Sequence, residues 1–312
     1  MIEALMDKTL SCCIRLTDYL DAMLGMGAAL ATAWYFILFA LYPEALASLD
    51  FSPVAILFAL LLTLALHEGL HALALRLVGI RVMKIDLFEY PMQLSSPKQI
   101  RLRIPLGVGI TIGEPITRNK NLATLLSPLA LSPALLLLAP HMDGLLRGVL
   151  VNASHFNILS CSGDLTLFLL LLSTNRDAII RDEGQALAVY GKCPPALFTR
   201  LLRSLGASGA VLFLMFIVVF PHLVTATWLS KSEQVINAVR QAHANTTLYY
   251  DYYGLITLRV DIWRTPSSYG FKNSYQPGPL FLTTTFAAAL AVGIARYRDL
   301  SQKAGRTTSL EP

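Results

Sequence analysis

The residues with the clearest chemical capacity form a short motif, His67-Glu68-Gly69-Leu70-His71. Residues four apart on an α-helix share a face, so the imidazoles of His67 and His71 can bind one metal ion. Glu68 lies beside them, where it can take a proton from a metal-activated water rather than bind the metal itself. The spacing therefore predicts a Zn2+ site with Glu68 as the catalytic base.

The motif lies in an apolar stretch, residues 53–78, that is long enough to cross a bilayer. Three ionisable side chains in five residues of a membrane span are costly unless they are satisfied, so they are candidates for function. A structural polar cluster between helices, or a proton path in a transporter, would use the same residue types. The spacing favours a metal site over these two alternatives.

A zinc ion bound by two histidines needs a third protein ligand in addition to water. The candidate ligands are Asp164, Glu183, His155, His141 and Glu114. If the stretches 53–78 and 148–172 both run from outside to inside, Asp164 lies about 24 Å deep and the two histidines about 20–27 Å deep, at ~1.5 Å per residue. We therefore predict Asp164 as the third ligand, with Glu183 as the alternative.

Two further polar residues, Asn157 and Ser160, share the predicted helix face of Asp164. They could orient a metal ligand or hold the backbone of a substrate. Hydrogen bonding to a neighbouring helix is the alternative for both, and we favour it for Ser160. His155, nine residues before Asp164, falls on the opposite side of the same helix.

The composition indicates the kind of scaffold that must position these residues. Hydrophobic residues make up 54% of the chain and charged residues 14%, whereas soluble domains have about 25% charged residues. We expect an all-α membrane bundle of about six transmembrane helices with a short cytoplasmic β-hairpin-like insertion. The predicted spans are 23–42, 53–78, 121–140, 148–172, 206–229 and 278–295.

The distribution of positive charge predicts the orientation of these spans. Lys and Arg number 19 in one set of connecting segments and 6 in the alternating set. The first set is 1–22, 76–120, 173–205 and 296–312, and the second is 43–52, 141–147 and 230–277. Because cytoplasmic loops are enriched in positive charge, the first set is assigned to the cytoplasm, together with both termini.

The predicted organisation has three parts: a cytoplasmic N-terminal segment (1–22), a membrane metallopeptidase domain (23–295) and a cytoplasmic tail (296–312). The formal net charge of +5 is explained by Lys and Arg flanking the spans, so no nucleic-acid partner is expected. The lipid bilayer is the expected environment, and the oligomeric state is left open.

Two connecting segments have patterns of their own. Residues 100–104 and 108–112 alternate apolar and polar side chains in places, which predicts the strands of the β-hairpin. Residues 230–277 are rich in tyrosine and are predicted as an outside loop. That loop could lie against the membrane surface as an aromatic belt or contact a partner, and the aromatic belt is favoured.

Several of these motifs resemble the intramembrane site-2-protease-like zincins, and more closely the bacterial family of putative zincin peptidases. The resemblance rests on His67-Glu68-Gly69-Leu70-His71 with the following Ala72-Leu73, on Ser162-Gly163-Asp164, and on Leu126-Ser127-Pro128-Leu129, and it covers roughly residues 50–190. It implies cleavage of a membrane-associated peptide bond, with Asp164 as the third zinc ligand. Unlike the better-known site-2 proteases, this chain has no Pro between Asn157 and Asp164.

The sequence thus predicts an intramembrane zinc metallopeptidase that acts on membrane-protein or peptide substrates, in a prokaryotic inner (plasma) membrane. The substrate must be extended, because a helix hides its carbonyls in its own hydrogen bonds, and residues 100–113 could supply an edge for β-addition. The alternatives are a transporter or a proton or metal-ion path using the same polar residues, and an inactive zincin-like membrane scaffold.

Overall fold

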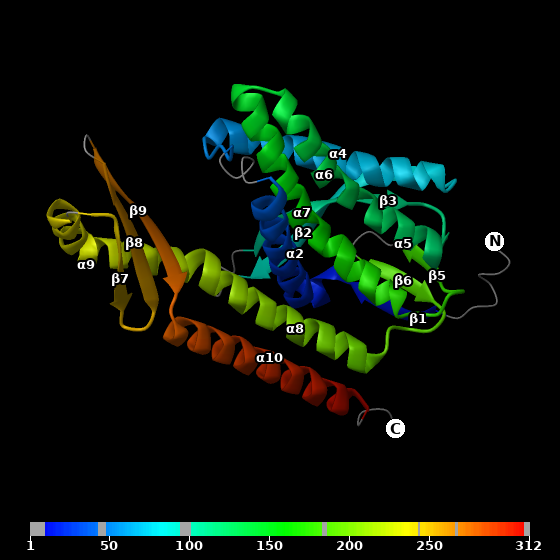
Figure 1. The fold of residues 1–312 in the computed structure, drawn as a ribbon. Coiled ribbons are helices and arrows are strands. Elements are labelled where there is room, and N and C mark those ends of the chain that lie inside the picture. Colours follow the sequence, from blue (N-terminus) through cyan, green and yellow to red (C-terminus); the bar gives the residue numbers. More distant parts are fainter. Residues whose placement is uncertain are drawn as a thin grey trace. The chain divides into compact units, whose positions relative to one another are not determined.

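A computed structural model describes residues 10–42, 48–93, 101–182, 186–242, 244–265 and 268–308 of the chain (Figure 1). The chain divides into two compact units, Met1–Gly206 and Ala207–Pro312. The α-helices are α2 (Leu20–Leu41), α4 (Pro53–Leu77), α5 (Arg118–Leu126), α6 (Leu131–Leu138), α7 (Gly144–Leu172), α8 (Ala196–Leu214), α9 (Phe220–Gln241) and α10 (Pro279–Thr308). There are also short 3-10 helices, η1 (Leu16–Tyr19), η2 (Ser127–Ala130) and η3 (Ala139–His141), and a short π-helix, η4 (Met215–Val219). The strands are β1 (Leu10–Arg15), β2 (Val82–Gln93), β3 (Arg101–Ile112), β4 (Ile116–Thr117), β5 (Ile179–Asp182), β6 (Ala186–Tyr190), β7 (Thr246–Tyr252), β8 (Ile256–Arg264) and β9 (Tyr269–Pro277).

The prediction of an all-α bundle with one short β insertion is wrong. The described residues contain three antiparallel sheets, with strand orders β1-β6-β5-β4, β2-β3 and β7-β8-β9. The four-stranded sheet pairs segments far apart in the chain, since Leu10–Arg15 lies beside Ala186–Tyr190. Its strands have two to six residues, which is too few for apolar alternation to identify them. The short strands and their pairing between distant segments explain why the sequence pattern did not predict this sheet.

The β2–β3 hairpin lies where the sequence predicted one, but it is larger than a short insertion. Each strand has 12 residues, and the pairing runs from Val82 opposite Ile112 to Gln93 opposite Arg101. β3 also packs against α4, the helix that carries the histidine motif. The hairpin is therefore an extended ribbon beside that helix.

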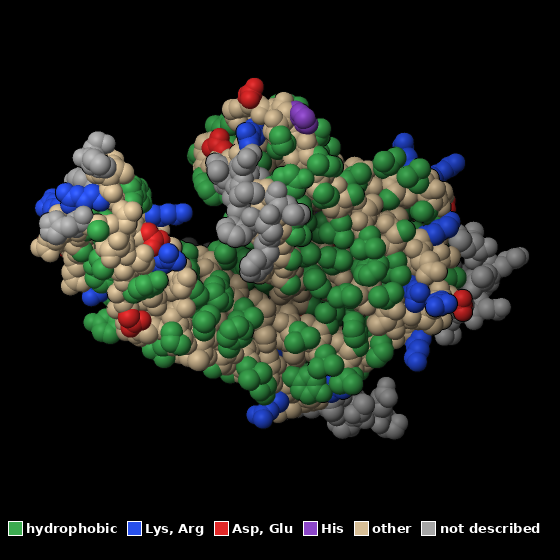
Figure 2. All heavy atoms as spheres, viewed as in Figure 1, with side chains coloured by type: hydrophobic (Ala, Val, Ile, Leu, Met, Phe, Trp, Pro, Cys, Tyr) green, Lys and Arg blue, Asp and Glu red, His purple; other side chains and the backbone are tan. Residues whose placement is uncertain are grey.

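Five helices are long and apolar enough to cross a membrane, which is compatible with a multi-pass membrane protein. They are Pro53–Leu77, Arg118–His141, Gly144–Leu172, Ala196–Gln241 and Pro279–Gln302, among the described residues. The first predicted span, 23–42, is helical as α2 but is not one of these five. Large apolar side chains are exposed on α4, such as Leu57 at 56% and Leu61 at 54%, and hydrophobic side chains cover much of the face shown in Figure 2.

The described residues of unit 1 form two apolar cores, and α7 contributes to both. One core lies among α2, α4, α6 and α7, and includes Leu38, Ala59 and Val151. The other joins the ends of α4 and α7 to the four-stranded sheet, and includes Leu170 and Ile180. Because α7 packs against α2, α4, α5 and α6, several of its polar residues, among them Asn152, Ser154 and Asn157, are buried between helices.

In unit 2 the described residues of the segment 230–277, predicted as an outside loop, form the end of a helix and a three-stranded sheet. α9 runs to Gln241, and β8 buries alternate residues against it, among them Leu258 and Val260. The tyrosines do not form one surface, because Tyr250 packs against this core whereas Tyr253 is 79% exposed. The predicted tail begins inside α10, which continues to Thr308, and residues 309–312 are outside the described part.

Candidate metal centre

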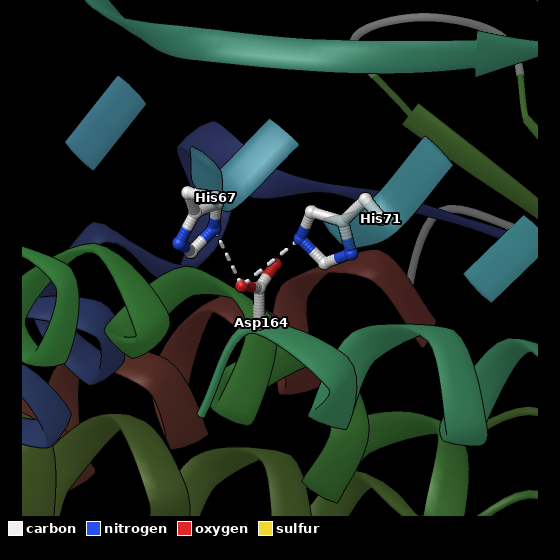
Figure 3. A group of neighbouring side chains, drawn as sticks. All are labelled: His67, His71 and Asp164. Carbon is white, nitrogen blue, oxygen red and sulfur yellow. Dashed lines mark hydrogen bonds and ion pairs between the residues drawn. The ribbon is translucent and has the colours of Figure 1, made fainter. Parts of the chain in front are cut away.

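The candidate site forms where α4 and α7 pack together. His67 and His71 are one turn apart on α4, and both rings point toward the Asp164 carboxylate of α7 (Figure 3). Oδ2 of Asp164 lies 3.1 Å from Nε2 of His67 and 3.2 Å from Nε2 of His71. One ligand atom from each residue lies within 4.8 Å of the others, so the structure brings together the three residues that the sequence predicted.

The other ring nitrogen of each histidine meets an oxygen. Nδ1 of His71 lies 3.0 Å from the backbone carbonyl of Thr124, and Nδ1 of His67 lies 2.9 Å from Oδ1 of Asn157. A carbonyl oxygen can only accept a hydrogen bond, so Nδ1 of His71 must carry the proton. The neutral ring of His71 therefore has its lone pair on Nε2.

The same conclusion holds for His67 because the Asn157 amide has one possible orientation. Nδ2 of Asn157 donates to the carbonyl oxygen of Pro128 at 2.9 Å and to Oγ of Ser132 at 2.8 Å. The carbonyl of Pro128 requires a donor, so the remaining amide atom facing His67 is the oxygen. Nδ1 of His67 donates to it, and Nε2 again carries the lone pair.

Two imidazole Nε2 atoms and a carboxylate oxygen thus converge at one point, an arrangement that either a metal ion or a proton on each Nε2 would satisfy. A zinc ion takes nitrogen and oxygen ligands at about 2.0–2.2 Å, so two ligand atoms of a tetrahedral site are separated by about 3.3 Å. The observed separations of 3.1 and 3.2 Å are close to that value. Metal-bound histidines also donate their second N–H to a carbonyl or carboxylate, as both rings do here, so the residues fit Zn2+.

Glu68 is the remaining charged member of the motif, and among the described residues its side chain has no hydrogen bond or ion pair with His67, His71 or Asp164. Its side chain is buried, with 9% of the residue exposed, and Oε2 has no hydrogen-bond partner among the described residues. A buried carboxylate oxygen without a donor is unusual in folded proteins. The position is suited to a group that exchanges a proton with water or substrate.

The other candidate ligands do not join this group. His155 bonds through Nδ1 to the carbonyl of Val151 in its own helix, and His141 and Glu114 are exposed. Glu183 lies outside the described residues. Asp164 is thus the carboxylate that the described structure places beside both histidines.

Some supporting groups were missed by sequence reasoning. The carbonyl oxygens of Thr124 and Pro128, and the hydroxyl of Ser132, hold the histidines directly or through Asn157. Backbone acceptors carry no residue-type pattern, which is why the sequence did not reveal them. Pro128 and Pro133 in the predicted span 121–140 were the available indication, because each proline interrupts the helical hydrogen-bond ladder.

A comparison with protein families gives a match to part of the chain. Residues 60–179 match the model of a family described as "Putative zincin peptidase". The match supports a zincin-type metallopeptidase. The matched segment contains His67, Glu68, His71 and Asp164, and zinc is the metal that this family description suggests. No curated protein and no solved structure matches the chain.

Proposed function

We propose that this protein is an intramembrane zinc metallopeptidase, related to the site-2-protease-like enzymes, that hydrolyses peptide bonds of membrane-associated protein substrates. In this proposal His67, His71 and Asp164 hold the zinc, and Glu68 is the catalytic base. The supporting observation is the convergence of two histidine Nε2 atoms on one carboxylate oxygen, with both Nδ1 atoms bonded to oxygen acceptors. The protein is proposed to lie in a prokaryotic inner membrane with both termini in the cytoplasm.

The chemistry divides between the metal and Glu68. Zinc, when bound, supplies a Lewis acid that polarises a carbonyl and acidifies water. Hydrolysis joins the water oxygen to the carbonyl carbon and breaks the carbon–nitrogen bond of the peptide. Glu68 takes one proton from the water and returns it to the leaving nitrogen. Its unpartnered Oε2 is available for both transfers.

An extended substrate is needed at this site, because a helical segment has its carbonyls bonded internally. β3 packs against α4, and β2 is its only ladder partner among the described residues. An extended peptide could therefore add to the other edge of β3 by main-chain hydrogen bonds. This is the proposed mode of presentation to the site.

The test compares host cells that produce the wild-type protein with cells that produce Glu68→Gln. Newly formed N-termini of membrane proteins would be profiled in both, with Glu114→Gln, an exposed carboxylate on the same chain, as the matched control. We expect new N-termini with wild type and with the control but not with Glu68→Gln. Identical profiles for wild type and Glu68→Gln, when both proteins contain zinc, would refute the peptidase proposal and favour a scaffold.

A further inference from the structure

The candidate span Arg118–His141 is broken beside the metal centre. α5 ends at Leu126, a 3-10 turn occupies Ser127–Ala130, and α6 begins at Leu131. Pro128 is buried in this turn. The break thus lies where the backbone faces α4 and α7.

Because residue 128 is a proline, the Thr124 carbonyl lacks its usual helical hydrogen-bond donor. In an uninterrupted α-helix this oxygen would accept the N–H of residue 128, four positions later, but proline has no N–H. It accepts instead from the backbone N–H of Ser127, from the Ser127 hydroxyl at 2.7 Å and from Nδ1 of His71 at 3.0 Å. Three donors already share the two lone pairs of this oxygen, so a further N–H at position 128 would compete with His71 for it.

The same turn also supports the other histidine. The carbonyl of Pro128 accepts from Nδ2 of Asn157, and Oδ1 of Asn157 accepts from Nδ1 of His67. Asn157 and Thr124 are both buried, at 0% and 4% exposed, so bulk water has little access to these two acceptors. Two backbone carbonyls one turn apart therefore orient both imidazoles.

We propose that Pro128 is a positioning residue of the metal centre. By lacking an N–H it leaves the Thr124 carbonyl to His71, and its own carbonyl orients His67 through Asn157. Both contacts keep the proton on Nδ1 and leave Nε2 to the metal. This inference rests on the proposed zinc-dependent function.

The first test is Pro128→Ala in the full chain, purified in detergent. Alanine restores the N–H at position 128, which can complete the helical bond to the Thr124 carbonyl. We expect zinc binding, measured by competition with a chelator, to weaken about 10–100-fold, while the Tm of the metal-free protein stays equal or rises. Pro140→Ala, an exposed proline at the far end of the same span, should leave zinc binding unchanged.

A purely structural proline gives the opposite pattern, a lower Tm of the metal-free protein with unchanged zinc affinity, and that result would overturn the proposal. A second variant keeps the proposal testable if Pro128→Ala misfolds. Replacement of Leu125 by its α-hydroxy acid makes the Thr124 carbonyl part of an ester and alters no side chain. An ester carbonyl is a weaker hydrogen-bond acceptor than an amide carbonyl. We expect weaker zinc binding here too, and wild-type affinity would overturn the proposal. A wild-type protein that binds no zinc would overturn both this inference and the proposed function.

Discussion

The Asn157 side chain joins three helices at the metal centre, and its replacement by alanine should weaken zinc binding as well as lower the stability of the fold. The residue is 0% exposed and makes three hydrogen bonds, to His67, to the Pro128 carbonyl and to Ser132. Without Oδ1, Nδ1 of His67 loses its acceptor and the ring can rotate or change tautomer. Loss of such a supporting group typically lowers metal affinity about 10–100-fold, or about 1.4–2.8 kcal/mol.

The stability of the metal-free Asn157→Ala protein should also fall. Each of the three lost hydrogen bonds contributes about 1 kcal/mol net, so we expect a decrease of about 2–4 kcal/mol in the free energy of unfolding. Zinc affinity would be measured by chelator competition, and stability by thermal unfolding with and without zinc. The two readouts separate a loss of metal binding from a loss of fold.

Ser160→Ala is the matched control for Asn157→Ala. Ser160 lies on the same helix, but it is exposed and its hydroxyl bonds to the carbonyl of Phe156 in that helix. Its removal should leave zinc affinity within about twofold of wild type, since an exposed hydroxyl contributes little. If Asn157→Ala bound zinc as tightly as Ser160→Ala, the assignment of Asn157 as the support of His67 would be refuted.

Two further predictions concern helix packing and cysteine reactivity. A side chain at Gly25 would collide with the backbone of Gly206, so Gly25→Val should lower the free energy of unfolding by about 1–3 kcal/mol. Gly69→Ala is the control, because its added Cβ meets nothing within 4 Å and should be nearly neutral in stability. Equal Tm values for the two variants would contradict this packing. Burial beside the Cys193 thiol raises the pKa of Cys12 to about 12, so its thiolate forms only at high pH. At pH 8 we expect iodoacetamide to modify Cys12 at least about tenfold more slowly than the exposed Cys13. Equal alkylation rates, measured by peptide mass spectrometry, would contradict that environment.

The candidate site was predictable because its chemistry is encoded in local spacing and depth. The four-residue separation of His67 and His71 places both rings on one face of a helix wherever that helix lies. Asp164 was located by its depth in a second span, and the structure brings its carboxylate within 3.1–3.2 Å of both rings. Its role as a ligand remains a prediction, as does the role of Glu68.

The sheets were less predictable because their pairing depends on contacts distant in sequence. Ile116–Thr117 is a strand only because Ile179 and Ile180 lie opposite it, and two residues show no period of their own. Residues 230–277 contain strand-like alternation in β8, but the abundance of tyrosine favoured an interfacial loop instead. The backbone acceptors at Thr124 and Pro128 follow from packing of three helices, which the sequence pattern does not specify.

The most direct test of the account is the zinc content of the detergent-purified protein. We predict about one zinc per chain in wild type, loss of that zinc in Asp164→Ala and in His67→Ala, and its retention in Glu114→Ala, a candidate ligand that lies exposed. Zinc that survives Asp164→Ala would contradict the ligand set and direct attention to Glu183. Absence of zinc from well-folded wild-type protein would contradict the central claim and favour a proton path through the same residues.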